Sequence, residues 1–262
     1  MSKPTIVLVP GAWHRPQHLH KVVDGLEKAG YEAQAVALAS VDASPPATSW
    51  DKDAEGVRDV ILKNLDAGKD VIVIAHSYGG FVMSEAVKGL GKKARQDGDG
   101  PKAGVLRLIY MCAVAPRKGE TVQDKTFPRT EEEAKLAESQ MKSMKIGEDG
   151  SMRPSPEDAE AASQQLYNRC SPEDIEAAIA QIGTFSIGPL LVPATYTAYL
   201  EIPSTYILCE NDRAFAPSAQ ERIIAEGEGA FDVVRCQEGH SPYLSNPGLI
   251  VDVIRKAAGE DI

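Results

Sequence analysis

Short, continuous runs of apolar residues alternate along the chain with stretches in which apolar residues recur at helical spacing. The runs are typical of strands buried on both faces of a parallel sheet. They predict strands at residues 5–9, 32–38, 71–75, 106–112, 205–209 and 231–236. The amphipathic stretches predict helices at residues 17–30, about 57–68, 81–87 and about 247–258. Strand, helix and strand in regular succession indicate βαβ units, so the pattern predicts an α/β fold with a mostly parallel sheet of about six strands flanked by helices.

The stretch between the strand that ends at Cys112 and the strand that begins at Thr205 is rich in charged residues. It contains three hydroxyl residues that are each followed three positions later by a carboxylate, which is the capping pattern of a helix N-terminus. These capping residues are Thr130, Ser155 and Ser171, and proline follows two of them, as is common at the first helical position. The stretch is therefore expected to form separate helices.

This difference in composition predicts two parts of one α/β unit. Residues 1–116 and 204–262 are assigned to the core, and residues 117–203 to an inserted helical cap. Ligands of open parallel sheets bind at the carboxyl ends of the strands, so an insert at that edge is expected to cover the site.

The run of β-forming residues that ends at Ala75 leads directly into His76-Ser77-Tyr78-Gly79-Gly80. A serine between a strand and a helix, with small residues around it, is typical of the G-x-S-x-G elbow, which exposes a nucleophilic hydroxyl at a strained turn. Ala75 replaces the first glycine of that pattern. An ordinary loop serine is the alternative, but the apolar residues at helical spacing after Gly80 supply the helix that the elbow requires and favour a nucleophile.

A serine nucleophile needs a histidine base and a carboxylate that orients the histidine, and in this elbow fold they follow the serine in the order acid, then histidine. Of the five histidines, only His240 comes after the last predicted strand. Glu210 and Asp212 follow the preceding strand, and Asp212 is favoured because the loop must carry the acid clear of the strand end. In the alternative interpretation, Asp212 caps a helix and His240 is a surface residue.

Two backbone N–H groups are candidates for an oxyanion hole, which stabilises the charge on the carbonyl oxygen of a substrate. They belong to Tyr78, directly after the nucleophile, and to Ala12, in the loop after the first strand. Gly11, Trp13 and His76 adjoin these groups and are assigned to substrate binding.

His14, His18 and His20 are close enough in sequence to suggest a metal site. However, Pro16 interrupts their spacing, and no nearby carboxylate or thiol completes a tetrahedral set. A polar loop that enters a helix is the favoured interpretation, and no metal or other cofactor is expected.

Charge and cysteine content narrow the function further. The chain has 262 residues, a formal net charge of −10 and no Lys/Arg run longer than two, which argues against binding to nucleic acid. No apolar stretch is long enough to span a membrane and no signal sequence is evident, so a cytoplasmic protein with a small-molecule substrate is expected. The four cysteines lack metal-ligand spacing and are expected to be buried free thiols. The sequence sets no oligomeric state and leaves a homodimer open.

Taken together, residues 7–14, 75–80, 170–174 and 206–212 resemble the α/β-hydrolase superfamily. The similarity is to the branch that holds plant methylesterases and hydroxynitrile lyases with their bacterial and fungal relatives, and it spans nearly the whole chain. Members of that branch open with H-G-A, and this chain has Pro10 in place of the histidine. The resemblance implies an α/β-hydrolase fold with a triad of Ser77, Asp212 and His240, and with Ala12 and Tyr78 as oxyanion donors.

The branch contains two chemistries. Lyases of this type carry threonine at the position of Gly11 and lysine at the position of Ser241, so the resemblance implies hydrolysis of a carboxylic ester or lactone. Lyase-type cleavage of a carbon–carbon bond and a small-molecule receptor with a retained triad stay as alternatives. Nine apolar residues of the insert are candidates for the pocket wall and suggest a small-to-medium apolar substrate: Met141, Met144, Leu166, Tyr167, Ile182, Phe185, Leu190, Leu191 and Tyr196.

Overall fold

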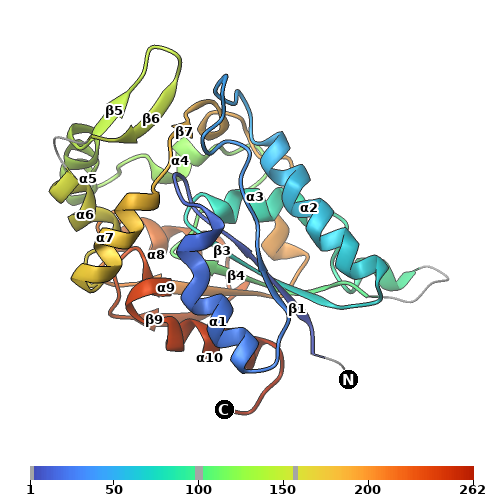
Figure 1. Cartoon of the computed structure of the whole chain (residues 1–262). Coiled ribbons are helices and arrows are strands. Elements are labelled where there is room, and N and C mark those ends of the chain that lie inside the picture. Colours follow the sequence, from blue (N-terminus) through green and yellow to red (C-terminus); the bar gives the residue numbers. More distant parts are fainter. Residues whose placement is uncertain (1–2, 98–102, 156–158) are drawn as a thin grey trace.

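In this computed structural model, which describes residues 3–97, 103–155 and 159–262, a six-stranded parallel sheet forms the centre of the molecule. The strand order is β2-β1-β3-β4-β8-β9, and every neighbouring pair is parallel. The strands are β1 (Thr5–Val9), β2 (Ala33–Ala35), β3 (Val71–His76), β4 (Val105–Met111), β8 (Ser204–Cys209) and β9 (Phe231–Cys236). The predicted α/β fold with six strands is therefore confirmed (Figure 1).

The apolar runs form strands because both faces of the sheet are covered. All residues of β1, β3 and β8 are buried. Side chains alternate along a strand, so Val7 and Val9 join one hydrophobic core, whereas Ile6 and Leu8 join the other. The edge strand β2 is shorter than predicted, because only three small or exposed residues pair with β1.

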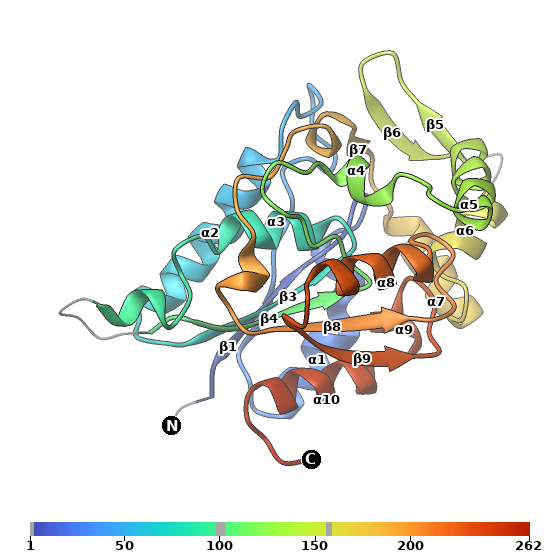
Figure 2. The same cartoon turned by 180° about the vertical axis from the view of Figure 1, so that it is seen from behind.

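Helices cover each face of the sheet (Figures 1 and 2). The short helix η1 (Pro16–Leu19), α1 (His20–Lys28), α9 (Pro242–Ser245) and α10 (Pro247–Ala257) lie on the face of Ile6. On the face of Val7 lie α2 (Asp51–Asp66), α3 (Gly79–Ala86) and α8 (Pro217–Glu226). The short helix η2 (Ala94–Asp97) precedes β4. Within the described residues, no helix has both the length and the apolar character to cross a membrane.

The segment between β4 and β8 holds helices and a second, antiparallel sheet of order β5-β6-β7. Its elements are α4 (Val122–Thr126), α5 (Glu131–Lys142), β5 (Met144–Ile146), β6 (Ser151–Pro154), α6 (Ala159–Leu166), α7 (Pro172–Gln181), β7 (Phe185–Ser186), η4 (Gly188–Leu190) and η5 (Ala198–Leu200). The sequence analysis expected only helices here and missed this sheet, whose strands of two to four residues are too short to establish an alternating pattern.

Two of the three predicted helix starts are confirmed. The hydroxyls of Thr130 and Ser171 accept hydrogen bonds from the backbone N–H groups of Glu133 and Asp174 at the starts of α5 and α7. The prediction at Ser155 extends over residues 156–158, which lie outside the described part of the chain. The arrowheads of β8 and β9 point toward the side on which α5, α6 and α7 lie (Figure 2).

Candidate active site

The link between β3 and α3 has the geometry of a nucleophile elbow. Ser77 has φ of 52°, in the left-handed region that non-glycine residues rarely adopt. Gly79 and Gly80 permit the tight turn, because a Cβ atom at Gly79 would lie 2.3 Å from the carbonyl oxygen of Pro10, and one at Gly80 would lie 2.6 Å from that of Val114. Within residues 71–80, Ser77 is the one residue that is not buried. The turn therefore presents the serine side chain.

Asp212 and His240 form a buried pair at the carboxyl ends of β8 and β9. The Nδ1 atom of His240 lies 2.8 Å from Oδ2 of Asp212. The carboxylate also accepts hydrogen bonds from the backbone N–H groups of Ala214 and Phe215, both at 2.8 Å, and from the side-chain amide of Gln220 at 3.0 Å. A carboxylate next to Nδ1 favours the tautomer that carries its proton there, which leaves Nε2 as the acceptor. The alternative acid, Glu210, is paired with Arg235 instead.

Ser77 and His240 line the same cavity, which has a volume of about 290 Å³. Trp13, Ala12 and Tyr78, which the sequence analysis proposed for substrate binding or the oxyanion hole, line it as well. The hydrogen bonds of the described residues do not include one between Ser77 and His240. Gly11 and His76, which were assigned to substrate binding, are not among the lining residues.

The backbone N–H groups of Ala12 and Tyr78, two residues of the cavity wall, are unused donors within the described part of the chain. Among the hydrogen bonds of the described residues, none uses the backbone N–H of Ala12 or of Tyr78. Both residues line the cavity beside Ser77. Gly11 packs directly against the elbow, because a Cβ there would lie 2.8 Å from Nδ1 of His76 and 2.9 Å from Cβ of Ser77. Two free N–H groups beside a serine are what an oxyanion hole requires.

His76 packs against His240 but is not among the residues that line the cavity. Its Nε2 atom is 2.7 Å from the backbone oxygen of His240, and the two rings are 4.5 Å apart between centroids. Burial is the main cause that lowers the pKa of His76 well below its usual value, and the nearby His240 and His14 add to it. The ring is therefore neutral, and its Nε2–H donates the hydrogen bond to the backbone oxygen of His240. His76 therefore holds the His240 loop rather than contacting a ligand.

His14 links the loop after β1 to the insert. Its Nδ1 atom is 2.6 Å from the backbone oxygen of Ala12, and its Nε2 atom is 2.9 Å from the hydroxyl of Tyr167. Burial, aided by the nearby His18, lowers the pKa of His14 well below its usual value, so the ring is neutral. A neutral imidazole has one donor and one acceptor, and the carbonyl of Ala12 can only accept. Nδ1 therefore donates to Ala12, and Nε2 accepts from Tyr167.

The three N-terminal histidines lie where the loop after β1 enters η1 and α1, as expected, but two of them are buried. His14 and His18 are each 2% exposed, and only His20 is exposed. His18 lies beneath α7, where its Nε2 atom is 3.1 Å from the backbone oxygen of Ala178. The sequence gives no local signal for this burial, because α6 and α7 supply the covering groups from more than a hundred residues away.

Four cysteines remain free thiols, and Cys112, Cys209 and Cys236 are buried, as expected. The ligand atoms of His76, Cys112 and His240 lie within 4.8 Å of one another. One ring nitrogen of each histidine is occupied, by Asp212 and by the His240 carbonyl, whereas Nδ1 of His76 is buried without a hydrogen-bond partner in the described part of the chain. Burial raises the pKa of Cys112 to about 11, so its sulfur is a protonated thiol and a poor ligand. This chemistry does not favour a metal site.

Five of the nine apolar candidates of the insert line the cavity that holds Ser77: Met141, Met144, Leu166, Phe185 and Leu190. Tyr167 and Ile182 line a different cavity, described below. Leu191 is 52% exposed. The sequence analysis missed contributions from the core, among them Val114 and Phe215, which follow strands whose apolar residues looked like ordinary core.

Known proteins resemble this chain in sequence and in fold. The chain is 45% identical to a protein named alpha/beta hydrolase nvfD from Aspergillus novofumigatus over 262 residues, which are 100% of this chain and 99% of that protein. It is 25% identical to methyl jasmonate esterase 1 of Vitis vinifera, with 92% of this chain and 91% of that protein covered. Among solved structures, a pyrethroid hydrolase from Sphingobium faniae JZ-2 superimposes with a TM-score of 0.80 at 23% identity, over 98% of both chains. The family model described as "Alpha/beta hydrolase family" matches residues 6–253, and the chain therefore belongs to this family.

Proposed function

We propose that this protein is a serine hydrolase that cleaves a small-to-medium apolar carboxylic ester or lactone through an acyl-enzyme on Ser77. The observation that carries the proposal is the buried Asp212–His240 pair, which opens onto the same cavity as the elbow serine. The unused N–H groups of Ala12 and Tyr78 support it, because acyl transfer needs donors beside the nucleophile. The esterase names of several relatives agree with this reaction class.

The proposed reaction has two halves. In the first, the Ser77 hydroxyl oxygen attacks the ester carbonyl carbon while Nε2 of His240 takes the hydroxyl proton, and Ala12 and Tyr78 bind the oxyanion. His240 then gives the proton to the leaving alcohol oxygen. In the second half, water attacks the acyl-enzyme, His240 takes a proton from that water, and the acid leaves as Ser77 regains its proton. Catalytic hydrogen bonds are often long without substrate, so closure of Ser77 onto His240 is expected on binding.

The cavity wall favours an uncharged, apolar substrate. Apolar side chains predominate, and the one carboxylate of the wall belongs to Glu133. Burial opposes ionisation of Glu133, but hydrogen bonds from Arg222, Ser218 and the backbone of Arg129 outweigh it and lower its pKa to about 2. Glu133 therefore stays charged, but its charge is paired with Arg222, so the apolar remainder of the wall favours a neutral, apolar ester.

We infer that residues 117–203 act as the cap of this site. Much of the cavity wall comes from this segment, including Leu136 and Met141 of α5, Met152 of β6 and Leu190 of η4. Trp13, from the core, donates a hydrogen bond from Nε1 to the backbone oxygen of Met152 at 3.0 Å. The insert and the loop after β1 are thus in direct contact at the wall of the cavity.

The position that distinguishes lyases supports hydrolysis. Ser241 is 1% exposed and lies outside the cavity wall. Its hydroxyl is bonded to the backbone oxygen of Leu166 at 2.7 Å and to the Tyr243 hydroxyl at 3.0 Å. This position offers no cation to a departing cyanide.

The test is a panel of acyl esters, alkyl esters and lactones, assayed with the wild type and with Ser77→Ala. Turnover in the wild type should fall by several orders of magnitude in Ser77→Ala, with a residual rate of roughly 10³-fold over water from binding and the oxyanion hole. A fluorophosphonate should label Ser77, as identified by peptide mass mapping. Full activity in Ser77→Ala, or a label on another residue, would sink the proposal.

A further inference from the structure

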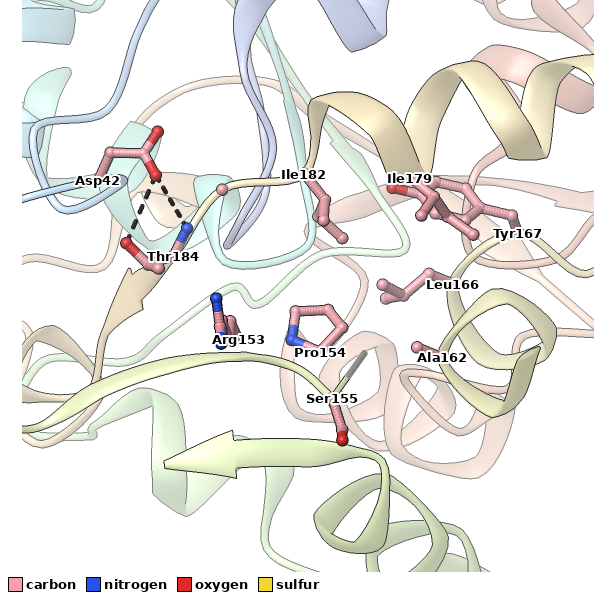
Figure 3. Close-up of a pocket in the computed structure, with 11 residues that line it drawn as sticks. Asp42, Arg153, Pro154, Ser155, Ala162, Leu166, Tyr167, Ile179, Ile182 and Thr184 are labelled. Carbon is pink, nitrogen blue, oxygen red and sulfur yellow. Dashed lines mark hydrogen bonds between the residues drawn. The ribbon is translucent and has the colours of Figure 1, made fainter. Parts of the chain in front are cut away.

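A second cavity of about 310 Å³ lies between β6, α6 and the end of α7 (Figure 3). Its wall is mainly apolar, with Leu166 of α6 on one side and Ile179 and Ile182 on another. Leu166 also lines the cavity that holds Ser77, so this side chain separates the two spaces. The volume is at the lower end of the range for small-molecule sites.

Among the described residues that line this cavity, two are charged, Asp42 and Arg153, and they differ in their partners. The carboxylate of Asp42 accepts hydrogen bonds from Arg15 at 2.7 and 3.0 Å, and from the backbone N–H of Thr184 at 2.9 Å. Figure 3 shows Asp42 turned toward Thr184. The backbone of Arg153 pairs with Lys145 of β5, but its side chain, in contrast to that of Asp42, forms no hydrogen bond or ion pair with the part of the chain that the structure describes. Arg15 neutralises Asp42, so Arg153 is left as the cation available to a ligand.

We propose that this second cavity binds apolar monocarboxylates, with the apolar body against Leu166, Ile179 and Ile182 and the carboxylate on Arg153. A guanidinium can donate two parallel N–H hydrogen bonds to a carboxylate, which fixes the orientation of the ligand. Burial of the apolar body against the apolar wall adds affinity but does not fix an orientation. The two cavities therefore select different ligands. The carboxylate beside Ser77 is the Glu133 carboxylate, which Arg222 pairs, whereas the described wall of the second cavity carries the unpaired guanidinium of Arg153. This proposal does not rest on ester hydrolysis at Ser77.

The charge is tested by calorimetric titration with octanoate and with 1-octanol, a neutral probe of similar shape. The wild type should bind both and prefer octanoate by about fivefold, the upper end for an exposed ion pair. Arg153→Gln should abolish this preference without lowering the affinity for octanol. Arg153→Lys should retain part of the preference for octanoate. Lys135→Gln is the matched control, because it removes an exposed positive charge from α5 outside both cavities and should change neither affinity.

The location is tested by filling each cavity separately. Ile182→Trp fills the second cavity from the end of α7, and Ala162→Leu fills it from α6. Each variant should therefore lower the affinity for octanoate by about tenfold or more. Ala137→Trp narrows the cavity beside Ser77 and should leave octanoate binding unchanged. Thermal unfolding of both filling variants establishes that they are folded. The proposal is overturned if the wild type does not bind octanoate, or if both filling variants still bind it with wild-type affinity. It is also overturned if Ala137→Trp abolishes octanoate binding, or if Arg153→Gln leaves the preference for octanoate unchanged.

Discussion

His240 and Asp212 are joined by a hydrogen bond of 2.8 Å between Nδ1 and Oδ2, in a position where the side chain of Asp212 is fully buried. Three further donors, from Ala214, Phe215 and Gln220, fill the remaining acceptor positions of this carboxylate. The carboxylate is therefore fixed in orientation, and it fixes the imidazole in turn. Two carboxylates follow β8, and this relationship favours Asp212 over Glu210 as the orienting acid.

The first prediction compares these two acids. Asp212→Asn should lower kcat for the best ester by about 10⁴-fold, because an amide can donate to Nδ1 and favour the wrong tautomer. Glu210→Gln changes only contacts with Arg235 and Gln237, outside the cavity, and should change kcat by no more than about twofold. Steady-state kinetics provides the measurement, with circular dichroism to verify folding. The reverse ranking would assign the orienting role to Glu210.

The second prediction concerns the bond between Tyr167 and His14. Tyr167→Phe leaves Nε2 of a buried, neutral His14 without its donor and should lower the free energy of unfolding by about 1–3 kcal/mol. The Ala12 peptide then loses part of its support, so kcat should fall by about tenfold with KM nearly unchanged, a smaller effect than the loss of an oxyanion donor.

The control for Tyr167→Phe is Tyr31→Phe. This change removes a hydroxyl bonded to Glu260 at 2.6 Å, remote from the cavity. It should affect stability but leave kcat as in the wild type. Equal kcat values in both variants would show that Tyr167 serves only stability.

The third prediction is a pH dependence of stability caused by buried histidines. Burial is the largest cause of the lowered pKa values of His14, His76 and His18. Below pH 6.5 the unfolded chain binds protons that the folded chain rejects, so this stability is complete above pH 6.5 and is lost as the pH falls. Below pH 6.5, each such histidine lowers the free energy of unfolding by about 1.4 kcal/mol for each unit by which the pH falls. The free energy of unfolding should therefore be lower at pH 5.5 than at pH 7.5 by about 2–4 kcal/mol.

Urea titrations at the two pH values measure this difference. His18→Gln removes one of the three buried groups and should flatten the dependence, whereas His20→Gln changes an exposed neighbour and should not. This window lies above the range in which ordinary carboxyl groups titrate, so the histidines dominate it. Identical pH dependence in His18→Gln and the wild type would contradict the assignment.

The fourth prediction separates hydrolysis from lyase chemistry. The wild type should not cleave mandelonitrile above the buffer rate. Gly11→Thr should depress ester hydrolysis, because its Cβ would lie 2.8 Å from the His76 ring and 2.9 Å from the Ser77 side chain. Adding Ser241→Lys buries a cation at a position that is 1% exposed and should destabilise the fold by several kcal/mol without creating a lyase. Mandelonitrile cleavage by the wild type that disappears in Ser77→Ala would make the lyase the leading assignment.

The sheet and the elbow could be predicted because their signals are local. Val71–His76 is buried on both faces and forms one apolar run, and the glycines after Ser77 are required because the start of α3 packs against the backbone of Pro10 and Val114. Asp212 and His240 could be paired before the structure because their order after the serine is a property of the fold. In each case the decisive information lies within a few residues or in the order of the chain.

The environment of His14 could not be predicted, because its partner Tyr167 lies 153 positions away. The same holds for His18, which meets Ala178 across 160 positions. The second cavity is also a product of tertiary packing, since it needs the end of α7 to meet β6. In the insert, short strands such as Met144–Ile146 are too brief for periodicity to reveal them.

The hydrogen bond between His14 and Tyr167 also limits how the chain can be recombined. An exchange of residues 117–203 with a relative would transfer Tyr167 but leave His14 behind in the core. A chimera whose new insert lacks a hydroxyl at this point would bury an unpaired imidazole next to the Ala12 peptide. Grafting designs should therefore treat His14 and Tyr167 as a single inherited unit, although they belong to different parts of the sequence.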